Sequence, residues 1–239
     1  MSDMLKKLLK DGALAAEVNL NCNQLDKFEK FYEYLIEKNK VMNLTAITEV
    51  REVVFKHFID SIALISKMDL HNRKIIDVGT GAGFPGIPLA IVLEDANFLL
   101  MDSLNKRIKF LNEVIELCEL NNVTTIHARA EELGRDVQYR EKFDICVSRA
   151  VANISTLLEY CMPFVKVGGV FVSYKSGDVA EEIEASANAQ KQLFSKNREV
   201  IDFCIPNTDI TRSFVVFEKK KELNKKYPRQ GGKPRKNPL

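Results

Sequence analysis

One segment, residues 75–91, constrains the fold of this chain more than any other part of the sequence. It reads IIDVGTGAGFPGIPLAI, which is an apolar run closed by an acid, then a glycine-rich loop, then a second apolar run. This order is typical of a strand, a tight turn and a helix. Gly79, Gly81 and Gly83 lack a Cβ atom, so the backbone can take positive φ angles and approach a ligand at the carboxyl end of the strand. The segment therefore predicts a cofactor-binding turn.

Such a turn fits either a dinucleotide or S-adenosylmethionine. Alternatively, the turn serves only the packing of the strand against the helix. Residues 81–86 match G-x-G-x-x-G, the dinucleotide pattern. Against a dinucleotide, Asp77 precedes the first glycine, Gly79 extends the turn, and Pro85 has no N–H to offer a phosphate. A carboxylate suits a cationic cofactor better than a pyrophosphate. The pattern D-x-G-x-G-x-G resembles the first motif of the S-adenosylmethionine (SAM) methyltransferases, in which the acid corresponding to Asp77 lies near the amino-acid end of the cofactor.

Apolar patterns beyond this segment alternate between strand and helix. Candidate strands cover residues 74–78, 97–101, 123–127, 143–148 and 170–174, and candidate helices cover 86–93, 104–120 and 153–162. Such alternation predicts a parallel sheet covered by helices on both faces. A helix over 178–194 follows, and then two strand-like runs, 199–205 and 212–218, whose short link makes them antiparallel. The expected fold is a Rossmann-like α/β sheet of seven strands, mostly parallel with an antiparallel last strand, as in class I SAM methyltransferases.

The chain divides into three regions by pattern and charge. Residues 1–68 show helical spacing, residues 69–219 carry the α/β pattern, and residues 220–239 form a basic tail. From residue 219 onward there are nine Lys or Arg and one acid, so this segment carries +8, while the preceding residues carry −6. A basic arm of this kind predicts a polyanionic partner such as nucleic acid, with a disordered solubilising tail as the alternative. The candidate nucleic-acid-binding residues are Lys225, Lys226, Arg229, Lys233, Arg235 and Lys236.

Several function classes are disfavoured by composition. No run reaches the roughly 18 to 20 apolar residues that cross a bilayer, and the first ten residues lack a signal-peptide core, so we expect a cytoplasmic protein without a membrane partner. The five cysteines are widely spaced without a C-x-x-C pair, and the chain has three histidines. We therefore expect reduced cysteines and no metal site.

The residues that end the predicted strands are candidates for ligand contacts, because doubly wound sheets bind ligands at this edge. Asp102 ends the second strand, where a carboxylate can accept both hydroxyls of a ribose; its alternative role is to cap the next helix beside Ser103. Ala130 and Glu131 follow the third strand and are placed to flank an adenine ring. Glu131 and its neighbour Glu132 fit a solvated first helical turn equally well.

Arg149 ends the fourth strand, the position nearest the transferred methyl in SAM methyltransferases. Enzymes that methylate the adenine amine typically carry an acid, Asn or Ser at this position, followed by two prolines and an aromatic, and this motif is absent here. The segment also has no Pro-Cys pair to supply a thiolate for pyrimidine C5 methylation. Arg149 instead offers a planar five-donor cation that can bind phosphate, stack on a base or donate to a purine edge. A structural salt bridge is the alternative; in the segment FDICVSRAV the other charged residue is Asp144.

With these parts together, the chain resembles the RsmG (GidB) family of bacterial 16S rRNA guanine-N7 methyltransferases. The resemblance covers nearly the whole chain and rests on NLTAIT (43–48), HFIDS (57–61), the glycine segment, FDICVSRAV, and the tail pattern from Tyr227 to the final Pro-Leu. It implies SAM contacts at Gly79, Phe84, Ala130, Glu131 and Arg149 and a target guanine in the decoding-region loop. It also favours RNA binding by the tail.

The implied reaction needs little acid–base chemistry. Guanine N7 carries a free lone pair, so attack on the sulfonium methyl requires alignment rather than a general base. Two other function classes stay open from the residues: an NAD-dependent oxidoreductase, and a SAM-sensing RNA-binding module without catalysis. The sequence leaves open the oligomeric state and whether naked 16S rRNA or the 30S subunit is the substrate.

Overall fold

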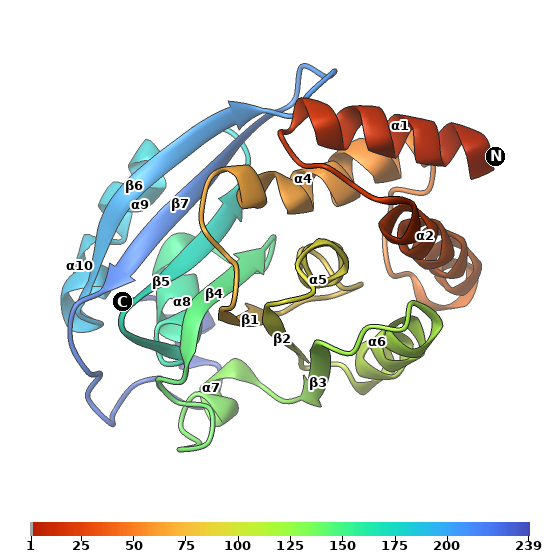
Figure 1. Cartoon of the computed structure of the whole chain (residues 1–239). Helices are drawn as coiled ribbons and strands as arrows, with labels where there is room; N and C mark the ends of the chain where they lie inside the picture. Colours follow the sequence, from red (N-terminus) through yellow and green to blue (C-terminus); the bar gives the residue numbers. More distant parts are fainter. Residues whose placement is uncertain (1) are drawn as a thin grey trace.

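The alternating patterns of the sequence assemble into one seven-stranded sheet within residues 2–239, which the computed structural model describes (Figure 1). The strand order is β3-β2-β1-β4-β5-β7-β6. Strands β3, β2, β1, β4 and β5 pair in parallel, whereas β7 is antiparallel to both β5 and β6. The predicted mostly parallel sheet with an antiparallel last strand is confirmed, and this strand, β7, lies between β5 and the edge strand β6. The strands are β1 (Lys74–Val78), β2 (Asn97–Asp102), β3 (Val123–His127), β4 (Phe143–Arg149), β5 (Val165–Lys175), β6 (Ser195–Cys204) and β7 (Thr211–Lys219).

Helices cover both faces of this sheet. Alternate residues of each central strand enter two separate apolar clusters: Ile75 packs with the N-terminal helices, α5 and α6, while Ile76 packs with α7 and α8. Figure 1 shows α1, α2, α5 and α6 on one side of the sheet and α8, α9 and α10 on the other. The doubly wound arrangement is thus confirmed. These helices are α5 (Gly86–Val92), α6 (Asn105–Leu117), α7 (Ala130–Leu133), α8 (Ile154–Cys161), α9 (Ala180–Ala185) and α10 (Ala187–Gln192).

The N-terminal region is helical, as its spacing predicts. It contains α1 (Ser2–Ala15), α2 (Cys22–Met42), α3 (Val50–Val53), a π-helical segment (Val54–Ile59), α4 (Asp60–Ile62) and a 3-10 turn (Ala63–Ser66). Phe28 and Phe58 are fully buried with ring centroids 5.0 Å apart. Because these rings belong to the apolar cluster that also holds the sheet residue Ile75, the core runs across the boundary at residue 68. The division into three regions stays a prediction.

The single helix predicted over 178–194 is wrong, because the chain forms two short helices there. Ser186 separates α9 from α10. Its hydroxyl donates to the carbonyl of Ile183 and accepts from the side-chain amide of Gln190. Local side-chain bonds of this kind compete with a continuous helix.

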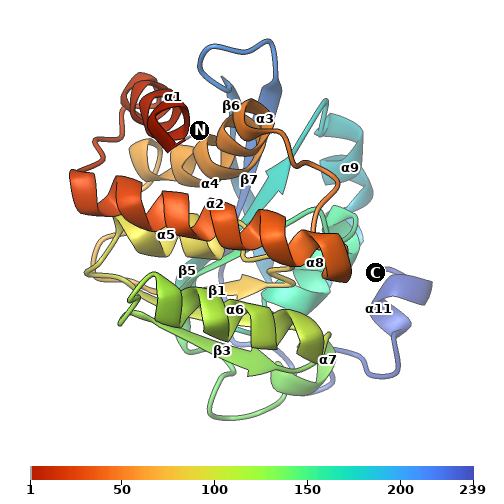
Figure 2. The same cartoon turned by 90° about the vertical axis from the view of Figure 1, so that its right-hand side faces the viewer.

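The basic tail is folded against the body of the protein. Tyr227, Pro228 and Pro234 are buried, and the Tyr227 hydroxyl donates to Gln192 Oε1 at 3.1 Å. A short helix, α11 (Lys233–Lys236), lies beside α8 near the C-terminus (Figure 2). The structure therefore contradicts a disordered solubilising tail.

Candidate active site

A cavity of about 1110 Å³ opens where β1, β2, β4 and β5 end. It lies at the point where the chain passes from one face of the sheet to the other, because β1 pairs with both β2 and β4. Pockets that hold one small ligand measure roughly 300 to 1,000 Å³. The cavity therefore has room for a cofactor. Its wall combines the glycine loop, the ends of four strands, the N-terminal helical region and the tail.

The glycine loop presents its backbone to this cavity. Gly79, Gly81 and Gly83 have φ angles of 75°, 62° and 95°, as their positions in the motif predict. The N–H groups of Gly79 and Thr80 donate to the carbonyl of Met101 at 2.9 and 3.1 Å, which fixes the loop to β2. A Cβ atom at Gly81 would meet no protein atom within 4 Å, since it would enter open space. This cradle fits a cofactor that packs against the backbone.

Asp77 supports the loop from behind. Its side chain is fully buried, and Oδ2 accepts from Thr80 Oγ1 at 2.7 Å and from the N–H of Gly86 at 2.9 Å. The other oxygen, Oδ1, has no partner within residues 2–239. Burial raises the pKa of Asp77 to about 7. Because Asp77 is not among the residues that line the cavity, the structure gives it a positioning role in place of the predicted contact with the cofactor.

Asp102 reaches the cavity and also forms hydrogen bonds to the glycine loop and to α6. It lines the cavity and is 3% exposed. Oδ2 accepts from the N–H of Gly81 at 3.0 Å and from Arg107 Nη1 at 3.1 Å, while Oδ1 accepts from the N–H of Leu104 at 2.9 Å. The carboxylate therefore ties the glycine loop to the start of α6. The start of α6 has no side-chain capping bond, either from Asp102 or from Ser103.

Ala130 and Glu131 reach the same cavity from the start of α7. Glu131 is 7% exposed, whereas Glu132 is exposed to solvent. Glu131 therefore faces the cavity, whereas Glu132 belongs to the solvated first turn of the helix. Gly81, Asp102, Ala130 and Glu131 together make the end of the cavity that we call the cofactor end.

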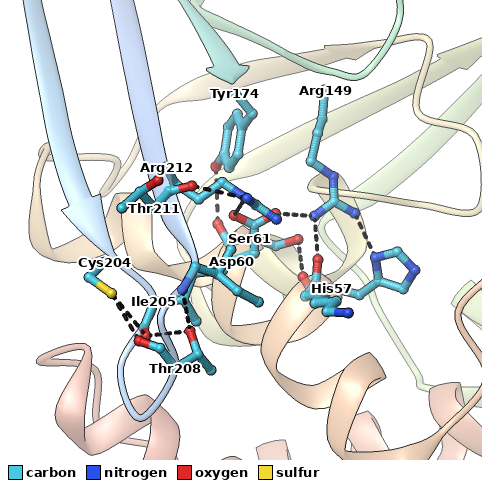
Figure 3. Close-up of polar contacts among 12 residues, drawn as sticks. His57, Asp60, Ser61, Arg149, Tyr174, Cys204, Ile205, Thr208, Thr211 and Arg212 are labelled. Atoms are coloured by element: carbon cyan, nitrogen blue, oxygen red, sulfur yellow. Dashed lines mark hydrogen bonds and ion pairs between the residues drawn. The ribbon is translucent and has the colours of Figure 1, made fainter. Parts of the chain in front are cut away.

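Arg149 ends β4, which lies on the other side of β1 from β2 and Asp102, and it belongs to a network of charged residues (Figure 3). Its Nη1 donates to Asp60 Oδ2 at 2.7 Å, and Asp60 Oδ1 accepts from Arg212 Nε at 3.1 Å. The guanidinium also lies 5.1 Å from the centre of the Phe84 ring, a cation–π distance. The salt bridge that the sequence disfavoured is therefore present, with a partner 89 residues away. Arg149 and Phe84 both line the cavity, and their contact with SAM stays a prediction.

Several cavity residues were identified only by family resemblance or not at all. Lys56 and His57 lie in the π-helical segment, a form that often marks functional sites. The His57 ring stacks on Phe84 with centroids 4.4 Å apart. Burial and the charge of Arg149 lower the pKa of His57 to about 3, so the imidazole is neutral. We call the group formed by Thr45, His57, Asp60, Arg149 and Arg212 the target end of the cavity.

The predicted RNA-binding residues of the tail fall into three groups. Arg235 and Lys236 line the cavity. Lys225, Lys226 and Lys233 are exposed, and Lys226 Nζ lies 5.0 Å from the Tyr227 ring centre. Arg229 forms a salt bridge at 2.6 Å with Glu159, whose side chain is fully buried. We therefore correct the prediction for Arg229, which holds the tail on α8 and is not free for RNA.

Two features that bear on function class are absent from residues 2–239. No group of three or more His, Cys, Asp or Glu side chains is arranged to hold a metal ion. No helix in the described part of the chain is both long and apolar enough to span a membrane.

Fold and site together define a class I SAM-dependent methyltransferase. The sheet is shared with M. jannaschii TYW2 in complex with AdoMet (TM-score 0.53, 20% identity, 68% of this chain and 76% of that one) and with a SAM-dependent O-methyltransferase from Thermotoga maritima (TM-score 0.51, 15% identity, 80% and 72%). The family model GidB, described as rRNA small subunit methyltransferase G, matches residues 24–211, and the chain belongs to this family. Proteins named ribosomal RNA small subunit methyltransferase G are 53% identical in Lachnoclostridium phytofermentans (95% of each chain) and 52% identical in Acetivibrio thermocellus (98% and 97%).

Proposed function

We propose that this protein transfers the methyl group of SAM to N7 of a guanine in the decoding-region loop of 16S rRNA. One observation carries the proposal: a single cavity joins a cofactor end, built on the glycine loop, to a cationic target end at Arg149. The names of the relatives supply the substrate, since they act on small-subunit ribosomal RNA. Because ribosomal RNA is the proposed substrate, the proposal includes a cytoplasmic location.

The residues of the two ends have separate tasks in this reaction. SAM supplies an electrophilic methyl group on a sulfonium. The backbone at Gly79 and Gly81 packs against the cofactor, Asp102 accepts the ribose hydroxyls, and Ala130 and Glu131 flank the adenine. Arg149 holds the guanine in line with the methyl. Alignment of this kind supplies up to roughly 7 to 11 kcal/mol of the barrier.

No protein group has to remove a proton. The N7 lone pair forms the new N–C bond, the C–S bond breaks with its electrons on sulfur, and the purine takes over the positive charge. The arrangement of His57 agrees with this chemistry. Its Nδ1 already accepts from Arg149 Nη2 at 3.3 Å, so the neutral imidazole is not free to act as a base.

Basic side chains around the cavity favour RNA over a small acceptor. Lys56, Arg129, Arg212, Arg235 and Lys236 all line it. Positive groups gathered at one site neutralise phosphates and position the strand. N7 lies in the deep, narrow groove of A-form RNA, so a paired guanine must first be exposed. Naked 16S rRNA and the 30S subunit are the two candidate substrates.

Product mapping tests the proposal. The protein is incubated with labelled SAM and with naked 16S rRNA or 30S subunits. Methylation at N7 makes the glycosidic bond and the imidazole ring of the nucleoside labile. Reduction followed by aniline treatment should therefore cleave the RNA at one guanosine. Methyl incorporation without cleavage would contradict N7 transfer. Binding of SAM and RNA without incorporation would instead support a SAM-sensing module.

A further inference from the structure

Thr45 is fixed at the cavity wall by bonds to its backbone. It lies in the loop between α2 and α3 and lines the cavity. Asn39 Oδ1 accepts from the N–H groups of Leu44 and Thr45 at 2.7 and 2.9 Å, and Asn39 Nδ2 donates to the carbonyl of Thr45 at 2.9 Å. Three bonds from one side chain therefore hold this loop, and the Thr45 side chain needs no movement to present its hydroxyl.

The direction of the Thr45 hydroxyl follows from its neighbours. Arg149 can only donate, so His57 Nδ1 must be the acceptor of the 3.3 Å contact with Arg149 Nη2. A neutral ring then carries its proton on Nε2, which donates to Thr45 Oγ1 at 2.9 Å. The N–H of Ile47 donates to the same oxygen at 3.0 Å. Oγ1 thus accepts two hydrogen bonds, and its proton has no protein acceptor within residues 2–239.

This free donor belongs to the target end of the cavity. His57 and Arg149 both lie against the Phe84 ring, at 4.4 and 5.1 Å, and Thr45 is bonded to His57. The chain brings Thr45 there from the N-terminal helical region, apart from the end of β2 that carries Asp102 and from α7, which carries Glu131. Under the proposed function, a group at this end faces the base that receives the methyl.

We propose that the Thr45 hydroxyl donates a hydrogen bond to O6 of the target guanine and so selects guanine over adenine; this inference rests on the proposed function. When N7 faces the methyl group, O6 lies beside it on the same edge of the base and accepts hydrogen bonds. Adenine presents an N6 amino donor at that position, so two donors would face each other and no hydrogen bond to the Thr45 hydroxyl proton would form. A base that cannot accept this hydrogen bond leaves the buried polar groups unpaired, and the cost of these unpaired groups makes the site selective.

The test combines enzyme variants with two RNAs under single-turnover conditions. One RNA carries guanine at the target position, and the other carries 2-aminopurine, which keeps N7 but has hydrogen in place of O6. Thr45→Val should slow transfer to guanine about tenfold and leave transfer to 2-aminopurine unchanged. Thr45→Ser, which keeps the hydroxyl, should restore most of the rate. Thr48→Val is the matched control, because Thr48 is exposed in the same loop and does not line the cavity.

Two results would overturn the assignment of Thr45. Equal slowing on both RNAs would show that Thr45 acts only on the structure, and weaker SAM binding by calorimetry would show that its hydroxyl faces the cofactor. If Thr45→Val does not fold, Thr45→Ala repeats the comparison with the same two outcomes. Absence of N7-methylguanosine with the wild-type protein and guanine RNA would instead reject the proposed function.

Discussion

The two ends of the cavity are built over different distances along the chain. At the cofactor end, Asp77 holds Gly86 nine residues away, and Asp102 holds Gly81 twenty-one residues away. At the target end, Arg149 reaches Asp60 across 89 residues, and Arg212 reaches it across 152. The cofactor end is therefore a property of one strand–turn–helix unit and its neighbour. The target end exists only once the helical region and the sheet have folded together.

The buried carboxyl groups near the two ends also differ in their partners. Asp77 has one oxygen without a partner in the described chain, and its pKa is raised. Asp60, which is 3% exposed, lies between two arginines. An unpaired buried acid costs stability when it ionises, whereas a paired one becomes costly when a partner is removed. The comparison thus predicts that stability depends on pH through Asp77, behind the cofactor end, and on mutation of the charged residues at the target end.

The largest expected effect concerns Asp77. Its pKa is about 7 in the folded protein against an ordinary value of 3.8, so between these pH values the folded state binds the proton that the unfolded state has released. Unfolding free energy should therefore fall as pH rises from about 4 to 7, by roughly 4 kcal/mol from this group. In Asp77→Asn this contribution disappears. Denaturant titrations of both proteins across this range measure the difference, and parallel curves would contradict the assignment.

Arg149→Ala should have the next largest effect, slowing single-turnover transfer about 100-fold because the base is no longer held in line with the methyl. Arg212→Ala is the matched comparison, because each variant leaves Asp60 with one arginine. Both should therefore lose less stability than the roughly 3 to 5 kcal/mol of an orphaned buried charge. Equal rates in the two variants would show that the pair acts only as a structural salt bridge.

Gly81→Val should raise the SAM dissociation constant about tenfold, because the side chain would occupy the open space beside the loop. Positive φ also strains valine, by roughly 1 to 2 kcal/mol. Gly168→Val controls for this strain, since Gly168 has a φ of 81° with open space and does not line the cavity. Calorimetry on both variants separates the two causes. Equal SAM affinity in Gly81→Val and the wild type would place the cofactor elsewhere.

The exposed tail lysines should give the smallest effect. Replacing Lys225, Lys226 and Lys233 with alanine should lower the log–log salt slope of RNA binding by roughly 0.7 to 0.9 for each phosphate that these side chains neutralise. Arg229→Ala should instead reduce thermal stability, because it leaves the buried Glu159 without its ion pair. An unchanged salt slope in the triple variant would exclude these lysines from the RNA interface.

The sequence predicts those parts of the molecule whose causes are local. Glycine spacing fixes the positive φ angles of the loop, and alternation of strands and helices fixes the layers of the sheet. Asp102 and Arg149 reach the cavity because each ends a strand, and Glu131 reaches it from the start of the helix that follows β3. Resemblance to a family adds the blocks that contain Thr45 and His57, although no local pattern shows which side chains these residues bond to.

Predictions fail where a distant partner decides the outcome. Arg149 lies in a nearly neutral segment, so its partner Asp60 is invisible until the helices pack on the sheet. Arg229 belongs to a basic run, and only the fold brings it to the buried Glu159. Asp77 shows the reverse case. Its motif position is right, but its side chain turns to Thr80 and Gly86 instead of the cavity.

The dependence of the chemical step on pH tests the central claim most directly. If the cofactor end supplies the methyl and the target end only aligns N7, the single-turnover rate with bound RNA should be nearly flat between about pH 6 and 9. Asp77 titrates within this range but lies off the cavity wall, so Asp77→Asn should give the same profile. A tenfold rise in rate per pH unit, traced to one side chain, would contradict the account and indicate an O- or C-methyltransferase.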